Sequence, residues 1–256
     1  MSINYCEKER VFTLQTQNAT YQMIVDSRGY LLHCYYGAKI ERQNLSYCIQ
    51  PQDRGFAANP PDAAGDRTLS PDTLPQEYST FGVGDFRESC LDVRDKNGGV
   101  AADLRYGSYR IYPGKKPLNG LPAAYGNEKD VDTLEIDLRD EVSGLVVTLR
   151  YSVFAQWDVI ARSAEIFNRG TGVLILERAL SCCLDEPVPA SRDILTFYGR
   201  HMGERNLERM PLRHGKFRVD SMRGASSPHY NPFVILCDSA ATETAGNCWA
   251  FSLVYS

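Results

Sequence analysis

Apolar and polar residues alternate in short runs along most of the chain, the pattern of β-strands with one buried face. Residues 20–37 hold two such runs around the turn sequence Asp-Ser-Arg-Gly, and residues 133–154 hold two more around a turn at 141–144. Residues 158–185 repeat the arrangement, with Asn-Arg-Gly in the connection. We therefore expect three antiparallel β-hairpins in these stretches.

Further alternating runs follow in the last third of the chain. Residues 215–224 and 232–239 each predict a strand, and residues 247–256 predict another. No turn residue and no polar tail follows this last run, so we expect a domain border near Ser256, with the natural protein continuing past it. The apolar face of this final strand would consist of Trp249, Phe251, Leu253 and Tyr255.

The pattern as a whole predicts an all-β fold. No stretch shows a 3.6-residue apolar period over more than two helical turns, and aromatic residues are frequent, with 15 Tyr and 10 Phe. No repeat or low-complexity tract divides the chain. We expect a large antiparallel sandwich of two sheets with few short helices, forming a single domain over residues 1–256.

One long stretch, residues 50–88, lacks the alternation and is rich in Pro and Gly. Loops of this length in a compact domain are usually functional or disordered. This one contains specific aromatic and charged side chains, so we expect an ordered loop, held to the sheet through Arg87. The side chains in question are Asp53, Arg54, Phe56, Arg67, Tyr78, Phe81, Phe86 and Arg87.

Composition excludes several classes of function. The formal net charge is −4 and no basic block is longer than two residues, which disfavours nucleic-acid binding. No apolar stretch approaches the ~18 residues of a membrane span, and the first ten residues lack a secretory signal, so a cytoplasmic protein is expected. The eight cysteines are then expected to be free and mostly buried thiols. Without C-x-x-C or H-x-x-x-H spacing, neither a metal site nor a cofactor is predicted.

Several long motifs occur in an order that resembles one enzyme family. They are DRGFAANP, DRTLSPDTLPQEYSTFGVGDFRE, DVIARSAEIFNRG, LTFYGRHMGERNLER, RGASSPHYNPF and FSLVYS. From about residue 37 to residue 256 the chain resembles the amino-terminal β-supersandwich domain of bacterial α-galactosidases of glycoside hydrolase family 36, a galactose-mutarotase-like fold. The resemblance implies a parent enzyme, often a homotetramer, that hydrolyses terminal α-galactosides such as melibiose or raffinose. It also implies a catalytic (β/α)8 barrel and a carboxy-terminal β-domain outside residues 1–256.

The resemblance places substrate-binding residues at three positions. Asp53 of DRGF corresponds to an Asp that accepts hydrogen bonds from galactose hydroxyls in the family. His201 stands where members often have a pocket Trp, beside Arg200 where Ala is common, and Arg67 would brace the Asp53 loop or contact substrate. From the residues alone, Asp53 could instead cap its loop or pair with Arg54 or Arg67.

No residue of the chain is predicted to be catalytic. Retaining enzymes of this family use two Asp residues on the barrel, with the nucleophile in a Lys-Trp-Asp-x-Asn motif. The nearest string here is Gln-Trp-Asp-Val at 156–159, at a hairpin corner, so Trp157 is interpreted as a packing residue and Asp158 as a turn residue. Two alternatives stay open: a stand-alone carbohydrate-binding or assembly module, and a sugar mutarotase using His33, the one histidine placed mid-strand.

Overall fold

The computed structural model describes residues 2–41, 43–56, 58–185, 191–223 and 228–254. They form two compact units, the first from Met1–Lys116 with Tyr125–Glu186 and the second from Pro117–Ala124 with Pro187–Ser256. That residues 1–256 form a single domain stays a prediction.

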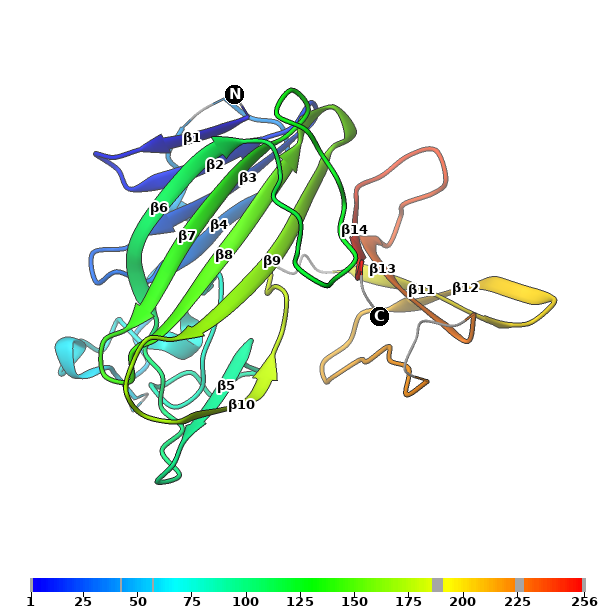
Figure 1. Cartoon of the computed structure of the whole chain (residues 1–256). Coiled ribbons are helices and arrows are strands. Elements are labelled where there is room, and N and C mark those ends of the chain that lie inside the picture. Colours follow the sequence, from blue (N-terminus) through cyan, green and yellow to red (C-terminus); the bar gives the residue numbers. More distant parts are fainter. Residues whose placement is uncertain (1, 42, 57, 186–190, 224–227, 255–256) are drawn as a thin grey trace. The chain divides into compact units, whose positions relative to one another are not determined.

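Two four-stranded antiparallel sheets lie face to face in the first unit (Figure 1). One has the order β1 (Ile3–Cys6), β2 (Val11–Gln15), β3 (Ala19–Val25), β4 (Leu31–Ala38). The other has the order β6 (Arg105–Pro113), β7 (Asp132–Asp140), β8 (Leu145–Phe154), β9 (Val159–Asn168). The predicted hairpins at 20–37 and 133–154 are confirmed as β3–β4 and β7–β8.

The third predicted hairpin is wrong in its pairing. Both strands exist, but β9 pairs with β8, while β10 (Leu174–Ala179) pairs with β5 (Leu91–Asp95) in a separate two-stranded sheet. The connection explains the difference. Arg169 donates its backbone N–H to Gly144 O at 2.8 Å, so the chain crosses the β7–β8 turn instead of returning along β9.

The second unit contains one antiparallel sheet in the order β12 (Gly203–Pro211), β11 (Arg192–Arg200), β13 (Tyr230–Asp238), β14 (Cys248–Ser252). β13 and β14 confirm two predicted strands, and Trp249 and Phe251 share the half-buried face of β14. β14 ends at Ser252, so Leu253 does not extend it, and Tyr255 lies outside the described residues. The strand predicted at 215–224 is wrong: within the described residues 215–223 the chain pairs with no sheet and its side chains are almost all exposed.

Helices are confined, in the described ranges, to four 3-10 turns of three residues each: η1 (Ser46–Cys48), η2 (Pro61–Ala63), η3 (Pro71–Thr73) and η4 (Ala155–Trp157). The prediction of an antiparallel all-β supersandwich with few short helices is therefore confirmed.

The core of the first unit lies between its two large sheets. In β7 the even-numbered residues Leu134, Ile136 and Leu138 are buried, and their neighbours Val147 and Leu149 in β8 are buried beside them. The facing sheet contributes Phe12, Leu14, Tyr21 and Met23. Each such side chain stabilises the fold by about 1.5–3 kcal/mol relative to its exposed state.

Candidate functional site

In the described residues of the stretch 50–88, side-chain hydrogen bonds hold the loop, as predicted. Asn59 fixes its path, because its Nδ2 donates to the carbonyl oxygens of Asp66 at 2.5 Å and Leu69 at 2.8 Å. Arg87 ties the end of the loop down: its guanidinium bonds Asp85 at 2.7 Å and Asp185 at 3.0 Å. Arg87 thus anchors the loop to itself and to the segment after β10, and not to a strand of the large sheets.

Asp53 lies in this loop with its side chain 61% exposed. Its Oδ1 accepts the backbone N–H of Gly55 at 2.9 Å and bonds Arg67 Nη2 at 3.0 Å. The Gly55 N–H, followed by the Arg67 guanidinium, lowers the pKa of the Asp53 carboxyl. Asp53 is therefore a carboxylate at neutral pH, and in the described part of the chain its Oδ2 has no protein donor. This oxygen is available to accept hydroxyl hydrogens.

Of the two arginines that could pair with Asp53, the structure places Arg67 against it. Arg54 pairs with Asp72 at 3.0 Å instead. The Arg67 side chain is 66% exposed, so the Asp53–Arg67 pair is a solvent-facing contact that orients the carboxylate.

His201 belongs to the second unit. It lies in the turn between β11 and β12, next to Met202, whose φ of +64° marks a tight left-handed turn. The imidazole is exposed. That His201 contacts substrate stays a prediction.

In the Gln-Trp-Asp string, the interpretation of Asp158 is confirmed and that of Trp157 is wrong. Asp158 is a turn residue, with φ +53°, and its carboxylate accepts the N–H of Asn18 at 2.8 Å and Asn18 Nδ2 at 2.7 Å. Trp157 does not pack in the core; it is 73% exposed, because η4 places it on the β8–β9 connection outside the sandwich. The string has no catalytic setting.

A buried polar cluster lies inside the sandwich, which the sequence analysis did not predict. The Glu77 carboxylate is 0% exposed and binds Arg162 Nη2 at 2.5 Å, Tyr21 OH at 2.6 Å and Tyr151 OH at 2.7 Å. Burial alone would raise the pKa of Glu77, but the Arg162 guanidinium and the accepted hydrogen bonds outweigh burial and lower it. The cluster joins the long loop, β3, β8 and β9.

His33 contacts this cluster, with Nδ1 at 3.6 Å from Glu77 Oε2. It therefore has the carboxylate partner that the mutarotase alternative requires. However, both side chains are almost completely buried, at 3% and 0% exposure, so no sugar reaches them in this structure. The pair is part of the core.

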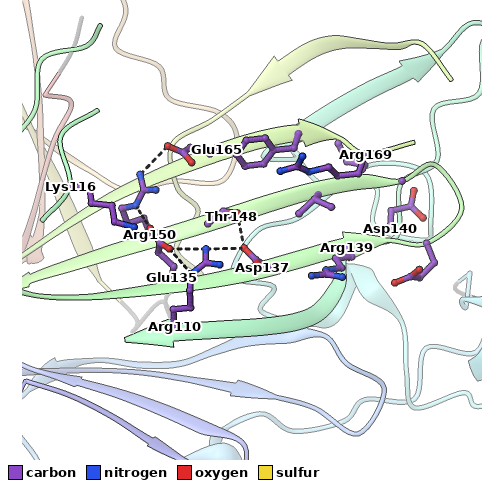
Figure 2. A pocket seen from close by; sticks show the side chains of 15 residues that line it. Arg110, Lys116, Glu135, Asp137, Arg139, Asp140, Thr148, Arg150, Glu165 and Arg169 are labelled. Atoms are coloured by element: carbon purple, nitrogen blue, oxygen red, sulfur yellow. Dashed lines mark hydrogen bonds and ion pairs between the residues drawn. The ribbon is translucent and has the colours of Figure 1, made fainter. Parts of the chain in front are cut away.

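A groove about 610 Å³ in volume lies on the outer face of the β6–β9 sheet, opposite the core (Figure 2). We call it the outer-face groove. It was missed at the sequence level, although charged residues at alternate positions of the predicted strands were a signal. Its lining consists of Arg110, Lys116, Glu135, Asp137, Arg139, Asp140, Glu141, Gly144, Leu145, Val146, Thr148, Arg150, Glu165, Phe167 and Arg169.

Ion pairs cross the floor of the outer-face groove from strand to strand (Figure 2). Arg110 Nη2 lies 2.8 Å from Glu135 Oε2, and Arg150 Nε lies 2.9 Å from Glu135 Oε1. Arg150 also bonds Glu165 at 3.1 Å. Burial opposes ionisation of Glu135, but hydrogen bonds from Tyr112 and both arginines lower its pKa on balance. The floor is therefore a fixed row of charges.

Metal and thiol chemistry find little support in the described residues. No group of three or more His, Cys, Asp or Glu side chains among them is placed to hold a metal ion. The eight cysteines are free, but the expectation that most are buried is wrong, since only Cys90 and Cys237 are buried. No helix in the described ranges is long and apolar enough to cross a membrane.

Comparison with known proteins gives one consistent family. Residues 29–256 match the family model described as "Glycosyl hydrolase family 36 N-terminal domain". The chain is 48% identical to the "Bifunctional alpha-galactosidase/sucrose kinase AgaSK" of Mediterraneibacter gnavus, over 100% of this chain and 27% of that protein. It is 42% identical to "Alpha-galactosidase AgaA" of Geobacillus stearothermophilus, over 100% of this chain and 35% of that protein. The chain thus spans between about a quarter and about a third of the length of these curated relatives.

Solved structures agree with the sequence matches. The galactosidase domain of AgaSK superposes with a TM-score of 0.92 at 48% identity, covering 97% of this chain and 34% of that one. A variant of AgaA from G. stearothermophilus in complex with raffinose superposes with a TM-score of 0.89 at 42% identity, covering 94% of this chain and 33% of that one.

Proposed function

Because the chain belongs to the glycosyl hydrolase family 36 N-terminal domains, we propose that it serves as the amino-terminal β-sandwich of a retaining α-galactosidase. The proposed substrates are small terminal α-galactosides of the melibiose and raffinose type, hydrolysed in the cytoplasm. The observation that carries the proposal is the match of the whole of this chain to part of an α-galactosidase at 48% identity. The raffinose complex of a relative 42% identical to this chain supports the substrate class.

The proposal assigns bond breaking to residues outside this chain. A retaining glycosidase needs two carboxyl groups ~5–5.5 Å apart on either side of the anomeric carbon. We assign both to a (β/α)8 barrel encoded beyond Ser256. The role left to the present chain is to form one wall of the galactose pocket and to support assembly of a homo-oligomer, a tetramer by resemblance.

Asp53 is the proposed contact to the sugar. Its Oδ1 is held by Gly55 and Arg67, which leaves Oδ2 to accept a galactose hydroxyl. A charged acceptor makes a stronger hydrogen bond than a neutral one and fixes the sugar ring relative to the catalytic groups. Arg67 positions this carboxylate. The exposed His201 ring is proposed as a second contact to substrate, from the second unit.

The test is to follow the gene's reading frame past Ser256 and to express both the longer protein and the 256-residue chain. We expect the longer protein to release galactose from raffinose and the 256-residue chain to release none. Galactose release by the shorter chain would contradict the proposal. A natural stop codon after Ser256 would contradict it as well and favour the stand-alone module.

A further inference from the structure

We propose that the outer-face groove binds a neutral oligosaccharide, at a site separate from the Asp53 loop. The groove lies on β6, β7, β8 and β9 and on the turns that join them, and neither Asp53 nor Arg67 lines it. Its volume of about 610 Å³ is within the range of small-molecule sites in proteins. The proposal does not depend on the α-galactosidase assignment.

The lining contains as many acidic as basic side chains. Five basic and five acidic side chains line the groove, so it has no net formal charge. A phosphate would meet the carboxylates, and a polyamine would meet the guanidinium groups, at a cost in repulsion. Sugar hydroxyls both donate and accept, and therefore suit a surface on which carboxylates and guanidinium groups alternate.

The floor of the groove is ordered before any ligand arrives. Glu135 and Arg150 are 3% and 8% exposed, and both are held by ion pairs from neighbouring strands. Thr148 Oγ1 donates to Asp137 at 2.7 Å in the adjacent row. Polar groups that are already fixed lose little conformational entropy when a ligand binds.

The rim provides the groups that remain available to a ligand. Arg139, Glu141 and Arg169 are exposed, and in the described part of the chain none of them forms an ion pair. Arg139 and Arg169 lie at one end of the groove and Lys116 at the other (Figure 2). The Arg169 guanidinium lies over the half-buried Phe167 ring, 4.9 Å from its centroid, and this cation–π contact helps to hold the side chain at the rim.

The experiment is a titration of the 256-residue chain with raffinose and stachyose by isothermal calorimetry. We expect saturable binding with a dissociation constant on the order of 1 mM, as befits an open and solvated site. The double variant Arg139→Ala/Arg169→Ala should weaken binding at least about tenfold, because two charged donors are removed. Arg94→Ala, which removes a surface arginine paired with Glu177 outside the groove, is the matched control and should bind as the unchanged chain does.

A second measurement on the unchanged chain covers the case in which the double variant does not fold. Backbone amide shifts perturbed by raffinose should cluster at residues 139–146 and 165–169. Asp53→Ala should leave the groove titration unchanged. Loss of binding in Asp53→Ala with retention in the double variant would overturn the proposal, as would the absence of saturable binding or shifts clustered elsewhere. None of these results depends on whether the longer protein hydrolyses galactosides.

Discussion

Glu77 shows how much the interior depends on one charge. Arg162 lies against it at 2.5 Å and is itself mostly buried, so removing the carboxylate charge would leave a buried cation without its counter-ion. We expect Glu77→Gln to lower the free energy of unfolding by about 3–5 kcal/mol. Urea denaturation followed by circular dichroism measures this. Glu177→Gln, which breaks the exposed pair with Arg94, is the control and should cost less than about 1 kcal/mol.

The same carboxylate predicts a pH dependence with a definite sign. The pKa of Glu77 is lowered in the folded state, so the group stabilises the fold at pH values above its unfolded pKa of about 4.5. This stabilisation is lost as the pH falls from there through the folded pKa. The stability difference between the unchanged chain and Glu77→Gln should therefore shrink on going from pH 7 to pH 3.5. A difference that stays constant over this range would contradict the assignment.

Asp53 can be tested in the longer enzyme that we propose. Asp53→Ala removes a charged acceptor, and the loss of one such hydrogen bond corresponds to roughly tenfold or more in kcat/KM for raffinose. Arg54→Ala, which removes a pair with Asp72 in the same loop, should have little effect. Unchanged kcat and KM in Asp53→Ala would remove the sugar contact assigned to it.

The sequence predicts the exposure and the partners of some residues but not of others. The exposed and ionised state of Asp53 was predictable from a loop motif, since its partners lie within 14 residues. Glu77 was not predictable, because its partner Arg162 is 85 residues away and only the closed sandwich brings them together. Trp157 was misjudged because hydrophobicity alone does not tell a core strand from the turn beside it.

The β7–β8 turn offers a test at the level of an element. Gly144 has φ +73°, and a Cβ on it would lie 2.5 Å from the backbone nitrogen of Gly170. Gly144→Ala should therefore destabilise the first unit by about 1–3 kcal/mol, seen as a lower urea midpoint. Gly172→Ala is the matched control, since a Cβ there meets nothing within 4 Å. Equal midpoints for the two variants would show that the turn and the β9–β10 connection do not depend on this close approach.

Strands were easier to predict than their partners. Alternation reports that one face is buried, and two runs joined by a short connection pair locally, as in β3–β4 and β7–β8. The β9–β10 connection is as short as the β3–β4 connection, yet β10 pairs with β5, with Leu174 opposite Asp95. Residues 215–223 also alternate, but they pair with no strand. Pairing is a property of the assembled sheets.

Across the whole molecule, buried side chains are concentrated in the first unit. The second unit contributes only Arg192, Ile194, Thr196 and Cys237 to the buried residues described. A unit with so small a core should unfold at a lower urea concentration than its neighbour. Its one tryptophan, Trp249, lies under the Arg192 guanidinium at 4.2 Å and reports on this unit.

We expect that in Trp157→Phe, where Trp249 is the remaining fluorophore, the fluorescence transition precedes the far-ultraviolet circular dichroism transition in urea. Substitution of the exposed Trp157 should not itself alter stability by more than a few tenths of a kcal/mol. Coincident transitions would mean that the two units unfold together.

The fold class of the molecule was predictable, because an all-β pattern and motifs spread over residues 37–256 both point to it. The outer-face groove was not, because it requires knowing that β6, β7, β8 and β9 are neighbours in that order. Charged residues on a strand show that its outer side meets water. They do not show that four such strands combine into one hollow.

β7 and β8 supply side chains to both the core and the groove, at alternate positions. In β7 the even-numbered residues face the core, and in β8 the odd-numbered residues do, so the position of a substitution decides which of the two it affects. Ile136 and Leu149 point inward, while Glu135 and Arg150 point outward. A slip of one position between the strands and the rest of the sandwich would turn the charged Glu135 and Arg150 into the apolar core and turn Ile136 and Leu149 out of it in the same step. A one-residue misalignment would therefore disrupt the hydrophobic interior and the groove together.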